Sequence, residues 1–174
     1  MKCYDIGDWD HFLSDFCQHW LTHNHDNRVE TLRQANPRTG NSDEFRLTEQ
    51  WTSSAKSVFH FDIQGQVAMA SHAVGPWLRF LRQNPQIKEL IHFWPFDDFE
   101  IPQNKSVIAE VYPSIFGKRY ESEDRTGDEH DAYSIAMWLK QMDGQGYLER
   151  YFNPPLSSSE RELPKLEGWI LGVY

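Results

Sequence analysis

Two carboxylates in the second half of the chain stand where acidic side chains are unusual. Glu110 lies near the carboxyl end of the apolar stretch 106–112, and Asp131 lies near the start of the helical stretch 128–142. Open α/β sheets place their functional sites at the carboxyl ends of strands. Carboxylate oxygens suit Mg²⁺ or Mn²⁺, and a pair of such ions supports phosphodiester hydrolysis. We therefore predict that Glu110 and Asp131 are catalytic residues and metal ligands.

Each of these acids also has a structural interpretation. The stretch 106–112 is apolar on both faces, which predicts a central strand covered on both sides. An unpaired buried carboxylate is costly. In such a strand Glu110 is therefore paired, protonated, close to the end of the strand, or bound to a cation. Asp131 can instead complement the positive end of the helix dipole. A two-ion centre normally has three or four acids, so this pair needs further ligands.

Other charged residues are candidates for substrate contact. Arg46 and Glu49 are three residues apart, a spacing that a surface helical ion pair explains equally well. Lys118 and Arg119 closely follow the strand of Glu110, where they either contact a phosphate or are solvated in a loop.

A histidine cluster lies on and after the first predicted helix. His19 and His23 have the four-residue spacing of metal ligands, and His25 is close by. No acidic third ligand accompanies them, so we interpret them as structural or surface histidines.

The composition predicts one domain, residues 1–174, with a substantial core: 39% of residues are hydrophobic and 14% aromatic. A net charge of −9 argues against coating DNA by bulk electrostatics, although metal ions can supply local positive charge. Cys3 and Cys17 have no metal-ligand spacing, which favours a reduced, cytoplasmic chain. No apolar run is long enough for a membrane span, and the start lacks the pattern of a signal peptide.

The elements that position these side chains alternate between helix and strand. We expect helices at about 8–23, 27–36, 66–83, 128–142 and 147–152, with Gly75-Pro76 splitting the third. We expect strands at 56–61, 90–96, 106–112 and 167–174, with loops at 37–44 and 153–162. The inner stripe of the fourth helix is predicted to be Ala132, Ile135, Ala136 and Leu139. This order predicts an α/β fold with a mixed sheet flanked by helices.

Several short motifs in a fixed order add a resemblance to this interpretation. They are FRLTE (45–49), AKSVFHFDIQGQVAMAS (55–71), HFWPFD (92–97), AEVYPSIF (109–116), HDA (130–132) and EGWILGV (167–173). Together they resemble a family of uncharacterised bacterial and archaeal proteins of ribonuclease H-like fold, often described as predicted nucleases. The resemblance covers residues 45–174 and leaves 1–44 as a helical and loop lead-in.

The resemblance implies a fold and a set of site residues. It places Glu110 and Asp131 in the presumed active centre and adds Glu49 as a catalytic candidate. Arg46 and His130 become substrate-binding candidates, in addition to Lys118 and Arg119, which are candidates from their position after the strand. The implied substrate is nucleic acid and the implied cofactor is Mg²⁺ or Mn²⁺.

The chain departs from the family at its start. Such proteins usually open with a glycine- and aspartate-containing strand that supplies the first catalytic Asp, and nothing of that kind precedes Trp9. We therefore expect a ribonuclease H-like fold that is incomplete at the N-terminus and forms homo-oligomers through an exposed sheet edge. Two functions stay open: a metal-dependent nuclease, or a non-catalytic domain acting through protein–protein contacts.

Overall fold

The computed structural model describes residues 7–20, 45–52, 55–58 and 68–174 of the chain. Its α-helices are α1 (Trp9–Trp20), α3 (Leu47–Trp51), α4 (Ala68–Gln83), α5 (Gly127–Gly144), α6 (Leu148–Tyr151) and α7 (Glu162–Glu167). Its strands are β1 (Ile91–Phe93) and β2 (Ser106–Ile108), and short 3₁₀ turns are η3 (Lys88–Leu90), η4 (Pro113–Ile115) and η5 (Gly117–Arg119). The α/β class is confirmed, whereas the ribonuclease H-like fold stays a prediction. The expected helix at 27–36 and loop at 37–44 lie outside the described residues, as do His23 and His25.

The sheet is smaller than expected. β1 and β2 pair in parallel, with Ile91 opposite Ser106 and Phe93 opposite Ile108. Beyond β2, a single parallel bridge joins Glu110 to Ile170, where the Leu171 N–H donates to the Glu110 carbonyl over 2.8 Å. Within the described part of the chain the sheet is therefore parallel and not mixed.

Three predicted strands are wrong in extent, and the first of them, 90–96, is reduced to β1 (Ile91–Phe93). The stretch 106–112 is not a continuous buried strand, because pairing ends at Ile108 apart from the bridge, and Glu110 is exposed. Likewise, 167–174 contributes only Ile170, since its first residue closes α7. The described residues of the expected strand at 56–61, which are 56–58, form no strand.

The core lies where the sheet, the C-terminal segment and α5 meet. Trp94, Trp169 and Ile170 are almost fully buried there. Phe116 and Trp138 stack with ring centres 4.2 Å apart and join the turns after β2 to α5. Burying such aromatic rings contributes more apolar area per residue than any other side chain and is the main stabilisation available to this fold.

Helix α5 starts where the sequence predicts, but it buries a different face. Thr126 caps it, with the Glu129 side chain accepting from the Thr126 N–H over 2.8 Å. Its buried residues are Ser134, Trp138 and Met142, four residues apart. The predicted stripe is wrong in two of its four members, since Ala132 and Ala136 are exposed while Ile135 and Leu139 are partly buried. The aromatic ring of Trp138 sets the orientation of the helix.

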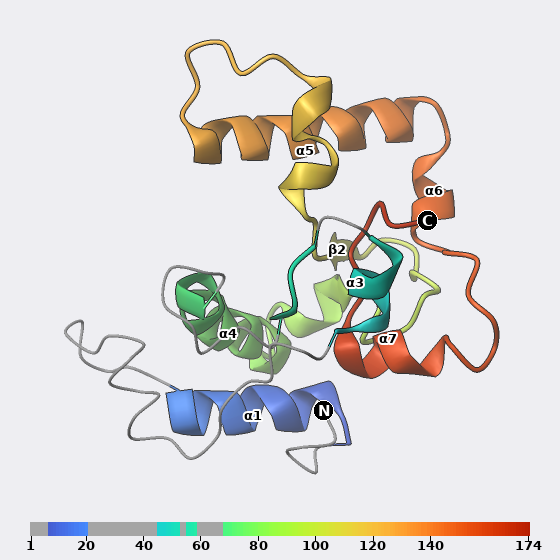
Figure 1. Cartoon of the computed structure of the whole chain (residues 1–174). Helices are drawn as coiled ribbons and strands as arrows, with labels where there is room; N and C mark the ends of the chain where they lie inside the picture. The colour runs from blue at the N-terminus through green and yellow to red at the C-terminus, as the bar shows by residue number, and fades with distance from the viewer. Residues whose placement is uncertain (1–6, 21–44, 53–54, 59–67) are drawn as a thin grey trace.

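Helix α4 is continuous through Pro76, so the predicted split is wrong. A proline ring normally clashes with the Cβ of the residue before it and disfavours a helical backbone there. The residue before Pro76 is Gly75, which has no Cβ and can therefore keep the helical backbone. Helices α1 and α4 lie together on the side of the molecule opposite α5 (Figure 1). No helix in the described ranges is both long and apolar enough to cross a membrane.

Candidate functional site

Arg46 is the centre of a buried ionic network in the described residues. It lies at the N-terminal end of α3 and is only 6% exposed. Its Nη1 donates to Glu110 Oε2 over 2.7 Å and its Nη2 to Glu110 Oε1 over 2.8 Å. Its Nε donates to Glu49 Oε1 over 2.8 Å. Both candidate glutamates of the sequence analysis therefore contact the same guanidinium, and we call the three residues the Arg46 centre.

Glu49 is a buried structural acid. Its side chain is 1% exposed, and Oε2 accepts from the Arg46 main-chain N–H over 2.9 Å. Oε1 accepts from the Val58 N–H as well as from the guanidinium. With both oxygens occupied by protein donors, Glu49 holds the start of α3 to the following segment. The ion pair between Arg46 and Glu49, which the spacing left open as an alternative, exists, but it is buried and not at the surface.

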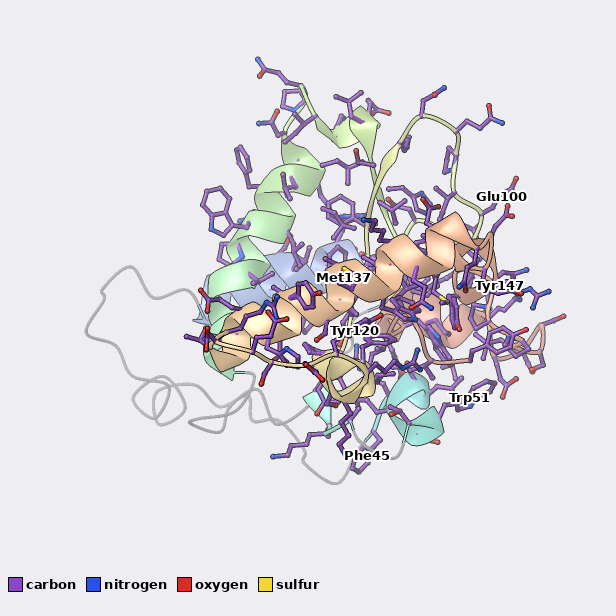
Figure 2. The ribbon with its side chains drawn as sticks, turned by 90° about the horizontal axis from the view of Figure 1, so that it is seen from above. Phe45, Trp51, Glu100, Tyr120, Met137 and Tyr147 are labelled. Atoms are coloured by element: carbon purple, nitrogen blue, oxygen red, sulfur yellow. The ribbon has the colours of Figure 1, made fainter. Side chains whose placement is uncertain are left out.

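The Arg46 centre also joins α3 to the C-terminal segment. Arg46 Nη1 donates to the Glu167 carbonyl over 3.2 Å, and the Thr48 hydroxyl accepts from the Ile170 N–H over 3.0 Å. Helix α3 itself lies at the surface, where Phe45 and Trp51 at its two ends are exposed (Figure 2). Two segments far apart in the sequence are thus joined by side chains of one short helix.

The electrostatics of the centre favour the charged form of Arg46. Burial works against the charged form of Arg46, but hydrogen bonds and attraction from Glu110 and Glu49 outweigh it and raise the pKa of Arg46 above its ordinary value. Bidentate guanidinium–carboxylate pairs of this kind are the strong class of hydrogen bonds. Glu110 differs from Glu49 because 45% of its side chain is exposed. Its charge is therefore partly solvated as well as paired.

The structure places the other predicted site residues elsewhere. Asp131 is exposed on α5, and no hydrogen bond or ion pair among the described residues joins it to the Arg46 centre. Figure 1 shows α5 as a separate layer from α3 and β2. Lys118 and Arg119 are exposed on η5, with the Arg119 guanidinium 5.6 Å from the Phe116 ring centre. His130 Nε2 lies 3.0 Å from the Gly117 carbonyl and ties α5 to η5.

The positions of Glu110 and Asp131 can be compared with the prediction that both bind Mg²⁺ or Mn²⁺. In the described part of the chain, no group of three or more His, Cys, Asp or Glu side chains could hold a metal ion. Each carboxylate oxygen of Glu110 accepts a hydrogen bond from Arg46, so the cation that this acid contacts is the guanidinium. Of the four alternatives for Glu110, pairing is therefore the one found, and the partner arginine lies 64 residues earlier in the sequence.

No family model, curated protein or solved structure matches the chain. The fold and the candidate site define an α/β protein with a small parallel sheet and a buried arginine between two glutamates. The likeness to predicted nucleases rests on the short motifs alone and stays a prediction.

Sequence reasoning missed a surface on α4. Val74, Trp77 and Phe80 follow each other at intervals of three residues and are all exposed. The signal was present in the sequence, because these residues, together with Leu78 and Leu81, recur at intervals of three and four and form one broad apolar stripe. It also missed Arg82, which binds two aspartates and two aromatic rings.

Proposed function

We propose that this chain works through protein–protein contacts and not through catalysis at the predicted carboxylates. The observation that carries the proposal is an exposed apolar surface on α4, which we call the α4 face. It consists of Val74, Trp77 and Phe80, whose exposed fractions are 47%, 67% and 50%. Scattered apolar residues are normal on a protein surface, but contiguous large ones mark interaction sites.

The α4 face is not required to build the core. Trp77 and Phe80 touch each other edge to face, with ring centres 6.0 Å apart, and are not part of the buried cluster. The other side of α4 faces the protein, where Gly75 is buried and Arg82 forms ion pairs with Asp10 and Asp97. Aromatic residues with this exposure are typical anchors of protein interfaces.

The partner we propose is a second copy of this chain, in which the two α4 faces pack against each other. The face carries no charge, so its self-association places no like charges in direct opposition. Its three side chains amount to roughly 300–400 Å² per copy, below the ~800 Å² per partner of a standard stable interface. We therefore expect a weak, reversible dimer. A net charge of −9 on each copy opposes association, so added salt should strengthen the dimer.

This proposal keeps the predicted homo-oligomer but moves its contact from the sheet edge to α4. Sedimentation equilibrium of the full chain tests it, with Trp77→Ser as the variant and Leu163→Ser as the control. Leu163 is 44% exposed on α7, so its replacement removes exposed apolar area at another site. We expect self-association of the wild type and the control, and at least tenfold weaker association of Trp77→Ser. Equal association of all three, or a wild type that stays monomeric at every attainable concentration, would refute the proposal.

A metal-dependent nuclease is the second candidate function. The specific observation in its favour is that 45% of the Glu110 side chain is exposed, next to the parallel bridge with Ile170. An exposed carboxylate at the end of a strand has the position expected for a ligand of Mg²⁺ or Mn²⁺. The Arg46 guanidinium competes directly with such an ion, which is why this function comes second.

A further inference from the structure

A second arginine lies at the junction of α1, α4 and the turn after β1. Arg82 Nε donates to Asp10 Oδ1 over 2.6 Å, and Nη2 donates to Asp10 Oδ2 over 2.8 Å. Nη1 donates to Asp97 Oδ1 over 2.8 Å, and the other oxygen of Asp97 accepts from the Phe93 N–H. The Arg82 side chain is 16% exposed, so the guanidinium is held in place by Asp97 and by the surrounding protein.

The same guanidinium lies against aromatic rings. Its central carbon is 5.1 Å from the Trp9 ring centre and 4.9 Å from that of Phe93. Trp9 also stacks on Phe96, with ring centres 4.0 Å apart and planes 15° apart. Trp9 and Asp10 are consecutive residues of α1, so one dipeptide is held both by stacking and by a bidentate ion pair.

We call the residues that receive this dipeptide the Arg82 surface: Arg82, Phe93, Phe96 and Asp97. They belong to α4, to β1 and to the turn after β1, which are continuous in the described chain. They provide an aromatic platform and a guanidinium with two N–H donors directed at one carboxylate. This is the chemistry of a recognition site for an aromatic residue beside an acid.

In the described part of the chain, helix α1 contacts this surface through side chains. No main-chain hydrogen bond within the described ranges joins α1 to another element. The Asp10 side chain is 63% exposed, and exposed ion pairs contribute about 1 kcal/mol or less. Leu13 and Cys17 add buried apolar contact on the same helix. Because these contacts are between side chains and α1 is not a strand of the sheet, α1 can be exchanged for another helix without breaking the pairing of β1 and β2.

We infer that the Arg82 surface is a binding site for a short helical segment in which Trp is followed by Asp, and that α1 fills this site within its own chain. The partner class is therefore an acidic amphipathic helix carrying this pair. Such a partner binds when α1 leaves, so α1 acts as an intramolecular competitor. This inference does not rest on the α4 face, which lies on another side of α4.

The test uses the full chain and a fluorescently labelled peptide of residues 7–20 under reducing conditions. Wild type is compared with Trp9→Ala/Asp10→Asn, which weakens the internal occupant and leaves the Arg82 surface intact. We expect fluorescence anisotropy to show at least tenfold tighter peptide binding by the double variant, because internal competition is reduced. Adding Arg82→Met to the double variant should abolish the tighter binding of the peptide. A peptide that itself carries the Trp-to-Ala and Asp-to-Asn changes should bind the double variant weakly.

Two results would overturn the inference. One is equal peptide affinity of wild type and the double variant. The other is loss of cooperative unfolding in both the double variant and the milder single variant Asp10→Asn, because α1 would then be an inseparable part of the core. Neither result would alter the expectation for Trp77→Ser, so the two proposals fail separately.

Discussion

The guanidinium of Arg46 holds the carboxylate of Glu110 through two parallel hydrogen bonds of 2.7 and 2.8 Å. The same arginine holds Glu49 through its Nε. One cation is therefore shared by two carboxylates of different exposure, 1% for Glu49 and 45% for Glu110. The difference in exposure determines what each acid contributes to stability.

The first prediction ranks substitutions in the Arg46 centre. Arg46→Met leaves the charge of Glu49 buried without its counter-ion and should lower the free energy of unfolding by about 3–5 kcal/mol. Glu110→Gln should cost clearly less, because water already solvates part of that side chain and the amide oxygen can still accept from Arg46. Urea denaturation followed by far-UV circular dichroism measures both. A cost for Glu110→Gln as large as that for Arg46→Met would mean that the exposure-based ranking is wrong.

The second prediction concerns acid pH and Asp10. Hydrogen bonding from Arg82 lowers the pKa of Asp10 below its ordinary value of 3.8 despite partial burial. A carboxyl group with a lowered folded-state pKa contributes stability that is present above its unfolded pKa and is lost as the pH falls through the folded-state pKa. The wild type should therefore lose stability on acidification below about pH 4 by more than Asp10→Asn does.

Unfolding curves of the wild type and Asp10→Asn at about pH 6 and about pH 3 check this expectation. The gap between the two proteins should narrow at the lower pH. A gap that stays constant would show that Asp10 does not titrate in contact with Arg82.

The third prediction concerns a glycine near the end of the chain. Gly172 has a φ of +102°, and a Cβ placed there would lie 2.5 Å from Cζ of the buried Phe116 ring. Gly172→Ala combines backbone strain with overpacking and should cost about 2 kcal/mol or more. Gly144→Ala is the matched control, because Gly144 ends α5 and nothing lies within 4 Å of its added Cβ.

Thermal denaturation of both glycine variants measures the outcome. Gly144→Ala should be neutral or slightly stabilising, since alanine favours the helix. If Gly172→Ala unfolds at the same temperature as the control, Phe116 does not pack against the C-terminal segment as described.

The sequence was most informative where the signals are local. Helix α5 has its N-cap at Thr126 and an acid three residues later, and both of these signals lie within four consecutive residues. Its buried face was not predictable, because the position of Trp138 is set by stacking on Phe116, which comes from another segment. The continuity of α4 was also hidden, since a proline normally ends or kinks a helix.

In the candidate site too, local spacing was informative, whereas burial and contacts between distant segments were not predictable. The spacing of Arg46 and Glu49 correctly indicated an ion pair, but spacing cannot report that the pair is buried. The pairing of Glu110 was one of four options that the buried pattern allowed, and its partner comes from 64 residues away. Asp131 was grouped with Glu110 from its position after the strand, and the structure instead exposes it on α5.

The most direct test of the central claim, that Glu110 is the partner of Arg46 and not a metal ligand, is a Mn²⁺ titration of the full chain followed by electron paramagnetic resonance. The signal of free Mn²⁺ reports how much ion the protein binds. We predict that wild type and Glu110→Gln reduce this signal equally, with no stoichiometric site that depends on Glu110. A stoichiometric Mn²⁺ site present in the wild type and lost in Glu110→Gln would contradict the account and restore the nuclease as the leading function.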